Sequence, residues 1–311
     1  MIKVLVTGAS GYIGSAAARQ LAQAGHQVVA TARELNPSLA RILSQCELRT
    51  LDVLNGPYDD LPKDIDVVIH AATSNDILSR DFEKGMELSV FGTRRLLQWA
   101  RASGVKRLLF FSTFQVYGTE LRGTITESTP PAPLNDYGLN HLGGEELCSM
   151  HARTSSLQVV LVRPANVCGC PQAPTVRRET LVPMCFVREA LTTGRITLRS
   201  SGLQKRDFVT VRQVADACLW LSEQPMAANH GVANIASGTT WTVLELARWT
   251  ADVFRRLHGI EIPVIVESSE PTTSNEFRAS SCIPTSAAPP TTRDEIIAEI
   301  EMTLELFKVQ S

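Results

Sequence analysis

Short apolar runs alternate along the chain with stretches in which apolar residues recur at helical spacing. The runs are predicted to be buried strands and cover residues 2–6, 27–31, 66–70, 107–112 and 158–162. The helical stretches between them cover residues 15–24, 90–103 and 137–153. Strand–helix alternation with continuous aliphatic strands is typical of parallel sheets covered on both faces. The pattern therefore predicts an α/β fold with a Rossmann-type, doubly wound parallel sheet.

After residue 165 the alternation is less regular. Helical spacing returns over residues 181–193, 214–223, 243–257 and 293–307, and strand-like runs cover 195–199 and 232–236. Residues 267–292 are rich in Ser, Thr, Pro and Ala, which predicts an extended or mobile segment. We expect three parts: a dinucleotide-binding domain over 1–168 and about 206–236, a smaller C-terminal substrate-binding lobe over about 169–205 and 237–292, and a C-terminal helix over 293–311.

Length and composition fit this organisation and exclude several classes of protein. A chain of 311 residues, 44% of them hydrophobic, buries a large core without disulfides or a structural metal. The net charge of −2 argues against nucleic-acid binding, which needs concentrated positive charge. No apolar run approaches the ~18 to 20 residues of a membrane span, and no signal peptide fits before the first strand. We therefore expect a cytoplasmic protein.

The cysteines do not suggest a disulfide framework or a metal site. There are seven of them, scattered, with no CxxC pair and no Cys/His cluster at zinc-ligand spacing. Cys168 and Cys170 are the one close pair, and a reduced, packing or loop role is expected for both. No metal is predicted.

A glycine-rich turn follows the first predicted strand and opens the first helix. Its sequence is Gly8-Ala-Ser-Gly11-Tyr-Ile-Gly14. The first two glycines permit a tight turn and a close approach of backbone N–H groups to a pyrophosphate, and the third lets the helix and strand pack closely. The turn predicts dinucleotide binding by Gly8, Gly11 and Gly14, together with Tyr12 and Ile13.

The end of the second predicted strand bears on which nicotinamide cofactor is held. An acidic residue there favours NAD, whereas this chain has Thr31-Ala-Arg33, and arginine pairs well with the 2′-phosphate of NADP. NADP is therefore favoured over NAD, with a solvated surface arginine as the alternative. Asp52 suits a contact with the adenine amino group. The remaining candidate cofactor residues lie after other strands and are Val53, Ala71, Ala72, Thr73 and Pro164.

Several blocks occur in an order that resembles the extended short-chain dehydrogenase/reductase family, the NAD(P)-dependent epimerase/dehydratase group that acts on nucleotide sugars. Besides the glycine-rich turn, the blocks are His70-Ala-Ala72, Gly92-Thr93, residues 111–118, residues 163–167, residues 206–211 and residues 234–238. The resemblance runs along the whole chain. It implies a Rossmann domain and a homodimer formed through residues 90–103 and 137–153.

The resemblance also implies the catalytic residues, with one departure. Thr113 matches the residue that polarises the substrate oxygen, and Tyr137 matches the tyrosine of a Tyr-x-x-x-Lys pair that transfers a proton and holds the nicotinamide ribose. The lysine of that pair is replaced by His141, whose imidazole could still form hydrogen bonds with the ribose hydroxyls, so Tyr137 and His141 are both predicted to bind the cofactor. A second departure is Ser89, where the family usually has asparagine.

Replacing the lysine with histidine has an electrostatic cost. At ~5 Å and an effective dielectric constant of ~20, a lysine would stabilise the phenolate by roughly 3 kcal/mol. A histidine with an ordinary pKa is only about a quarter charged at pH 7. Three explanations stay open: His141 replaces the lysine adequately, Tyr137 is assisted by Lys205 or another residue, or the protein binds a dinucleotide without turnover. Gly143 and Gly144 are also expected to weaken this helix, by about 1 kcal/mol each.

The substrate residues are implied by the same resemblance. Residues 181–208 resemble the nucleotide-binding stretch of nucleotide-sugar enzymes, so Asn166 and Arg206 should meet a diphosphate, and Gln115 is a further substrate candidate. The alternatives are a loop-capping amide for Asn166, and an ion pair with Asp207 or a domain-interface contact for Arg206.

The predicted reaction is reduction of a keto carbon of a nucleotide-activated sugar. Dehydratases of this family have Asp-Glu after the catalytic threonine, whereas this chain has Phe114-Gln115, and neither side chain titrates. Carbonyl reduction needs only a hydride, a polarising hydroxyl and a proton donor. The alternatives are an epimerase with bound NAD, a reductase of a non-nucleotide ketone, and a catalytically silent dinucleotide sensor or scaffold.

Overall fold

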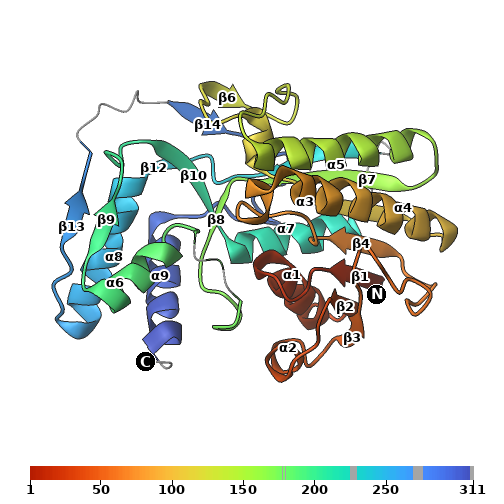
Figure 1. The fold of residues 1–311 in the computed structure, drawn as a ribbon, viewed down its shortest axis with the longest axis horizontal. Helices are drawn as coiled ribbons and strands as arrows, with labels where there is room; N and C mark the ends of the chain where they lie inside the picture. Colours follow the sequence, from red (N-terminus) through yellow and green to blue (C-terminus); the bar gives the residue numbers. More distant parts are fainter. Residues whose placement is uncertain (177, 179, 225–229, 269–275, 309–311) are drawn as a thin grey trace.

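A seven-stranded parallel sheet forms the centre of the fold in the computed structural model, which describes residues 1–176, 178, 180–224, 230–268 and 276–308 (Figure 1). The strand order is β11-β7-β5-β4-β1-β2-β3. The strands are β1 (Lys3–Thr7), β2 (Gln27–Ala32), β3 (Glu47–Thr50), β4 (Val67–His70), β5 (Arg107–Phe111), β7 (Gln158–Pro164) and β11 (His230–Ile235). Every pairing in this sheet is parallel. The predicted α/β, Rossmann-type fold is confirmed.

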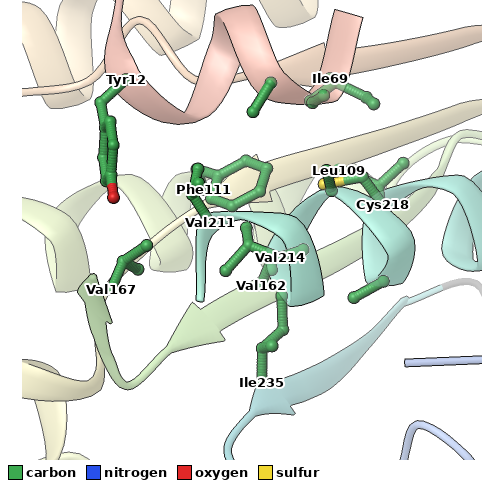
Figure 2. Close-up of a cluster of buried hydrophobic side chains, with 14 of the residues drawn as sticks. Tyr12, Ile69, Leu109, Phe111, Val162, Val167, Val211, Val214, Cys218 and Ile235 are labelled. Carbon is green, nitrogen blue, oxygen red and sulfur yellow. The ribbon is translucent and has the colours of Figure 1, made fainter. Parts of the chain in front are cut away.

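Alternate residues of the central strands enter two separate hydrophobic cores, as period-two strand geometry requires. In β1, Val4 and Val6 face one core and Leu5 faces the other. The helices α1 (Tyr12–Gln23) and α7 (Val211–Glu223) cover the first face, and α4 (Thr93–Ala102) and α5 (Asp136–Arg153) cover the second. Figure 2 shows the first core, where Val214 and Cys218 of α7 lie against the sheet.

The segment between β4 and β5 is helical over a longer range than the sequence predicts. It consists of a 3-10 turn (η1, Leu78–Arg80), α3 (Phe82–Met86), a π-helical turn (η2, Glu87–Gly92) and α4. Asp81 caps α3 by accepting a hydrogen bond from the Lys84 N–H. Such π turns are often found at functional sites, and this one contains Ser89.

A second lobe with its own core lies beside the carboxyl end of β7. Its core residues come from several short elements, including Phe186, Ile196, Phe208, Leu246 and Ile300. The elements of this region are β8 (Asn166–Cys168), α6 (Met184–Thr193), β9 (Ile196–Leu198), β10 (Lys205–Thr210), β12 (Thr240–Thr242), α8 (Val243–His258), β13 (Val264–Val266) and α9 (Arg293–Lys308). Figure 1 shows α6, α8 and α9 together, so the C-terminal helix is part of this lobe. The domain boundaries set from the sequence stay a prediction.

The segment predicted to be extended or mobile contains a short strand. Residues Phe277–Ala279 form β14, which pairs in parallel with β6 (Gly123–Ile125). Residues 269–275 of that segment lie outside the described residues. The remaining short elements are α2 (Pro37–Ile42) and the 3-10 turn η3 (Phe114–Tyr117).

Helix α5 is held unusually close to the sheet. A Cβ atom on Gly144 would lie 2.4 Å from the Phe110 ring and 2.8 Å from the Ser89 carbonyl oxygen. The next residue, Glu145, accepts two hydrogen bonds from the Arg163 guanidinium, and both side chains are buried. The expectation that this glycine mainly weakens the helix is therefore incomplete, because its missing side chain is what lets α5 approach β5 and β7.

Within the described residues, no helix is long and apolar enough to cross a membrane, and no cluster of His, Cys, Asp and Glu side chains is arranged to hold a metal ion. All seven cysteines are free thiols.

We predict that Glu145→Ala lowers the free energy of unfolding by about 3 kcal/mol, because it leaves the Arg163 charge buried without its partner. Chemical denaturation followed by circular dichroism measures the change. Glu146→Ala is the matched control, since Glu146 is the exposed neighbour on the same helix and should change stability by less than about 0.5 kcal/mol. Equal losses in the two variants would show that the ion pair does not hold α5.

Candidate active site

The residues predicted to bind a cofactor follow the carboxyl ends of adjacent parallel strands. Gly8 follows β1, Arg33 follows β2, Ala71 follows β4, and Thr113 lies just beyond β5. Pro164 is the last residue of β7. Open α/β sheets bind their ligands at this edge, where strand order reverses. The sheet order puts β1 and β4 side by side at that reversal, so the fold gathers these residues on one edge.

The turn between β1 and α1 has the geometry of a pyrophosphate cradle. Gly8 has a φ of +71°, and a Cβ atom there would lie 2.8 Å from the Ala71 carbonyl carbon. A Cβ atom on Gly14 would lie 2.3 Å from the Gly8 carbonyl oxygen. The N-cap of α1 is Gly11, which offers no side chain to the first N–H groups of the helix. Those N–H groups and the helix dipole suit an anion, so the turn fits a dinucleotide.

The side chain of Tyr12 is committed to the fold. Its hydroxyl donates a hydrogen bond of 2.8 Å to the Gly169 carbonyl oxygen, and the ring is buried (Figure 2). The part of Tyr12 that is available to contact a cofactor is therefore its backbone. The next residue, Ile13, packs partly buried against the first core.

The residues predicted to bind the adenosine end of the cofactor differ in whether their side chains already contact other residues of the protein. Arg33 is exposed and forms no ion pair with a described residue, so its guanidinium is available to a ligand. Asp52 caps a turn, because its carboxylate accepts hydrogen bonds from the Leu54 N–H at 2.9 Å and the Asn55 amide at 2.8 Å. Val53 is buried.

Two further candidates line the loop that follows β4. The Thr73 hydroxyl donates to the Phe111 carbonyl oxygen at 3.4 Å. Ala72 is partly buried, and its backbone nitrogen would lie 2.8 Å from a Cβ atom on Gly8. The backbone at this point thus leaves no room for a larger residue in the turn.

The two side chains expected to act on the substrate lie together. Asn135 caps the first turn of α5 by accepting a hydrogen bond from the Gly138 N–H at 2.8 Å, and this fixes the start of the helix that carries Tyr137. Thr113 is the N-cap of η3, and the Asn135 amide donates a hydrogen bond of 2.8 Å to the Gln115 side chain of η3, so the first turn of α5, which contains Tyr137, lies close to Thr113. Burial raises the pKa of the Tyr137 phenol, and Arg178 and the Thr113 hydroxyl oppose that rise. The geometry suits a proton donor beside a polarising hydroxyl.

His141 lies beside Tyr137 but is uncharged. The two rings are 4.7 Å apart in an edge-to-face contact. His141 Nε2 donates to the Ser74 carbonyl oxygen at 3.1 Å, whereas Nδ1 is buried without a hydrogen-bond partner among the described residues. Burial lowers the pKa of His141 to about 4, despite the opposing effect of the Ser74 and Phe111 carbonyls. At neutral pH the ring therefore carries even less charge than the quarter expected from an ordinary histidine.

Ser89 supports the orientation of His141 from the π turn. The Ser89 hydroxyl donates to the Ser74 hydroxyl at 2.8 Å and accepts from the Ser74 N–H at 3.1 Å. Because the Ser74 carbonyl receives His141 Nε2, the two serines position that ring indirectly. The Ser79 hydroxyl also donates to Ser74, and Asn140 donates to Ser79. Ser89, at the position where the family usually has asparagine, is thus part of a buried hydrogen-bond network.

A second buried histidine lies below this network. The Thr93 hydroxyl donates to the Ser89 carbonyl, so it accepts from His70 Nε2 at 3.0 Å. His70 Nδ1 is then the acceptor for the Thr7 hydroxyl at 2.7 Å. Burial lowers the pKa of His70 to about 3. This residue is a neutral structural link between β1, β4 and α4.

The predicted substrate residues come from the lobe and from η3. In the pairing of β8 and β10, Asn166 lies opposite Phe208, two positions from Arg206. The Asn166 amide donates to the Asp207 carbonyl at 2.9 Å, as expected of a capping amide. Arg206 is exposed and is not paired with Asp207, whose carboxylate accepts hydrogen bonds from the backbone N–H groups of residues 237 and 238. The alternative ion pair for Arg206 is therefore wrong.

Gln115 and Lys205 are both engaged with other residues. The Gln115 side-chain oxygen accepts a hydrogen bond from Asn135 at 2.8 Å, so Gln115 also braces the start of α5. Lys205 forms an ion pair with Glu276 at 3.0 Å. Assistance of Tyr137 by Lys205 is not supported by this geometry.

Sequence reasoning missed two charged residues near Tyr137. Arg178 lies in the loop between β8 and α6, and Asp76 lies in the loop after β4. Their side chains form an ion pair with a distance of 3.3 Å between the Arg178 guanidinium nitrogen and the Asp76 carboxylate. Neither residue belongs to a periodic element or a motif, so no local signal identified them.

Comparisons with known proteins agree with this architecture. The family model of the NAD dependent epimerase/dehydratase family matches residues 4–236. UDP-glucose 4-epimerase of Streptomyces lividans is 28% identical over 85% of this chain and 83% of its own length. dTDP-4-dehydro-6-deoxy-D-allose reductase of Streptomyces bikiniensis is 29% identical over 83% of each chain.

A solved structure shares both fold and sequence similarity. MoeE5 in complex with UDP-glucose and NAD is 25% identical, covers 99% of both chains and superposes with a TM-score of 0.78. The resemblance found in the sequence is confirmed, and the homologues are NAD-dependent enzymes. The chain therefore belongs to the NAD dependent epimerase/dehydratase family.

Proposed function

We propose that the protein is an NAD(P)-dependent reductase of a keto carbon in a nucleotide-activated sugar. The observation that carries the proposal is that η3, which begins after Thr113, and the first turn of α5, which contains Tyr137, are joined by the Asn135–Gln115 hydrogen bond at the ligand-binding edge of the sheet. The glycine-rich turn lies on the same edge. This arrangement supports a hydride donor, a carbonyl and a proton donor close to one another.

The chain's own residues account for the proton side of the reaction. A bound nicotinamide supplies the hydride to the carbonyl carbon. The Thr113 hydroxyl holds the carbonyl oxygen, and the Tyr137 phenol gives that oxygen its proton, so that the product is an alcohol and Tyr137 is left as a phenolate. A proton from solvent restores the phenol.

Elimination of water from the sugar has no support here. The residues after Thr113 are Phe114, which is buried, and Gln115, whose side chain braces Asn135. Neither side chain exchanges a proton. Reduction needs neither an acid nor a base at these positions.

The proposed substrate class follows from the lobe and from the relatives. Arg206 is exposed and lies on β10, the strand that pairs with β8, where Asn166 lies. A guanidinium at this place suits the phosphate oxygens of a diphosphate. The names of the relatives refer to UDP-glucose and to a dTDP-linked deoxy sugar, and MoeE5 holds UDP-glucose. These similarities favour a nucleoside-diphosphate sugar over a non-nucleotide ketone.

A nucleotide-sugar epimerase is the second candidate, because UDP-glucose 4-epimerases are among the relatives. An epimerase returns the same hydride to the sugar and keeps its NAD, whereas a reductase consumes its reduced cofactor. We favour reduction because of Arg33, which suits NADP. The homodimer also stays a prediction, and it is supported by exposed apolar side chains on the helices expected at its interface, such as Leu139 and Met150 of α5. The cytoplasmic location stays a prediction as well.

The first prediction tests the reaction. With 4-keto nucleoside-diphosphate sugars, the protein should oxidise one NAD(P)H for each alcohol formed, and Tyr137→Phe should lower kcat by about 10²-fold or more, because the proton donor is lost. Absorbance at 340 nm and product chromatography measure both quantities. Thr113→Ser is the control that keeps the hydroxyl and most of the turnover. Interconversion of sugars without net cofactor consumption would indicate the epimerase, and binding without turnover would indicate the silent sensor.

The second prediction tests the cofactor. Arg33→Ser should raise the KM for NADPH by about tenfold and leave the KM for NADH nearly unchanged, since only NADPH offers the 2′-phosphate. Steady-state kinetics with both cofactors measure this. Arg41→Ser removes another exposed arginine from the neighbouring helix α2 and should change neither value. A KM for NADPH that is insensitive to Arg33 would make this residue a solvated surface arginine.

The third prediction concerns the histidine. His141→Lys should preserve or raise turnover near neutral pH, because lysine adds a cation next to the Tyr137 phenol at the position where the family has one. Turnover and cofactor affinity are measured together. A collapse of turnover with cofactor binding intact would show that the imidazole has chemistry that lysine cannot replace.

A further inference from the structure

The first turn of α1 is held by a distant loop and not by a capping side chain. Its N-cap is Gly11, so no side chain accepts a hydrogen bond from the first N–H groups of the helix. Those N–H groups have to stay free if they are to bind a pyrophosphate. The hydroxyl of Tyr12, the first residue of α1, instead donates to the Gly169 carbonyl oxygen at 2.8 Å, in the loop after β8. Figure 2 shows the Tyr12 ring extending from α1 toward the segment that carries Val167.

The same peptide group is held at its other end by the C-terminal helix. Glu299 of α9 is buried, and its carboxylate accepts a hydrogen bond of 2.6 Å from the Cys170 N–H. The Gly169 carbonyl and the Cys170 N–H belong to one planar peptide unit. A Cβ atom on Gly169 would lie 2.8 Å from the bound carboxylate oxygen, so Glu299 also packs directly on this backbone. Tyr12 and Glu299 therefore hold a single rigid group between α1 and α9.

The charge of Glu299 strengthens this arrangement. The Cys170 N–H is the hydrogen-bond partner of its carboxylate, which forms no ion pair within the part of the chain that the structure describes. Burial raises the pKa of Glu299, and the Cys170 N–H opposes that rise. A carboxylate that accepts from a peptide N–H makes a strong, charge-assisted bond and polarises the peptide. The carbonyl oxygen at the other end thereby becomes a better acceptor for the Tyr12 hydroxyl.

The rest of this loop follows α1. The Gln172 side-chain oxygen accepts a hydrogen bond from the Arg19 guanidinium at 2.9 Å, about two turns beyond Tyr12. Ala173 and Val176 are buried in the first hydrophobic core, to which α1 also contributes. Figure 1 shows the loop between β8 and α6 passing between α9 and α1. The lobe is thus attached to the helix that begins at the glycine-rich turn.

We propose that Tyr12 and Glu299 are positioning residues for the cofactor. By holding the peptide between Gly169 and Cys170, they fix the first turn of α1, whose free N–H groups face the pyrophosphate. A turn released from this anchor presents those N–H groups less precisely, so the dinucleotide leaves faster. The C-terminal helix in this way sets the residence time of the cofactor. The inference concerns cofactor binding alone and is independent of which sugar is reduced.

The test measures the binding and release of NADPH and NADH by the full-length protein, using stopped-flow fluorescence. Tyr12→Phe removes only the hydroxyl, and Glu299→Leu removes the acceptor for the Cys170 N–H. Each should speed dissociation of the cofactor about fivefold and raise its Kd by a similar factor. Glu299→Gln keeps an oxygen acceptor and should retain most of the affinity.

Tyr117→Phe is the matched control. It also removes a buried tyrosine hydroxyl with a hydrogen bond of 2.8 Å, in this case to Asn234, away from the glycine-rich turn. It should lower thermal stability without changing cofactor release. If Tyr12→Phe and Glu299→Leu behave in the same way, with lower stability and unchanged cofactor release, the proposal is overturned and the contacts serve folding only.

A double-mutant cycle tests whether the two side chains act through one peptide. The variant with both Tyr12→Phe and Glu299→Leu should release the cofactor little faster than either single variant, because each substitution already frees the same group. Fully additive effects would contradict the proposal, as would a parent protein that binds neither NADPH nor NADH. If release changes as expected but no keto sugar is reduced, the positioning role stands and only the proposed function fails.

Discussion

The close contact between α5 and the central sheet is the constraint on which the candidate chemistry depends. Gly144 lets the helix approach the Phe110 ring, and the bidentate ion pair of Glu145 with Arg163 fixes the helix against β7. Asn135 and Gln115 hold the first turn. With its middle and its start fixed in this way, α5 presents Tyr137 to Thr113 at the carboxyl edge of the strands. A looser helix would leave the phenol without a defined partner.

The residue that replaces the family's lysine is oriented but uncharged. Its orientation comes from a buried hydrogen-bond network in which Ser89 and Ser74 hold His141. Its lack of charge comes from burial, which lowers the pKa of His141 to about 4. The ring can therefore position Tyr137 but supplies no cation beside the phenol at neutral pH.

The central sheet and its cofactor turn were predictable from the sequence because their signals are local. Aliphatic runs such as 66–70 mark strands buried on both faces, and the three glycines need no information from distant residues. The lobe was less predictable, since strands such as Asn166–Cys168 and Thr240–Thr242 have only three residues and no periodicity.

Within the site, the sequence could point to candidate residues but not to their environments. The resemblance led to Thr113 and Tyr137, which lie on η3 and α5, two elements joined by the Asn135–Gln115 hydrogen bond. The charge of His141 depends on burial that no neighbouring residue reveals, and the ion pair of Arg178 with Asp76 joins two loops without a sequence pattern. The packing role of Gly144 was missed for the same reason, because the groups it approaches are distant in the sequence.

The two neutral histidines have a consequence for the acid stability of the fold. In the unfolded chain both imidazoles take up protons near pH 6.5, whereas in the folded chain His141 does so only near a pKa of about 4 and His70 near a pKa of about 3. Between these limits the unfolded chain binds more protons, so acidification favours unfolding. The same buried rings that link the strands and helices of the site thus lower the stability of the fold in mildly acidic surroundings.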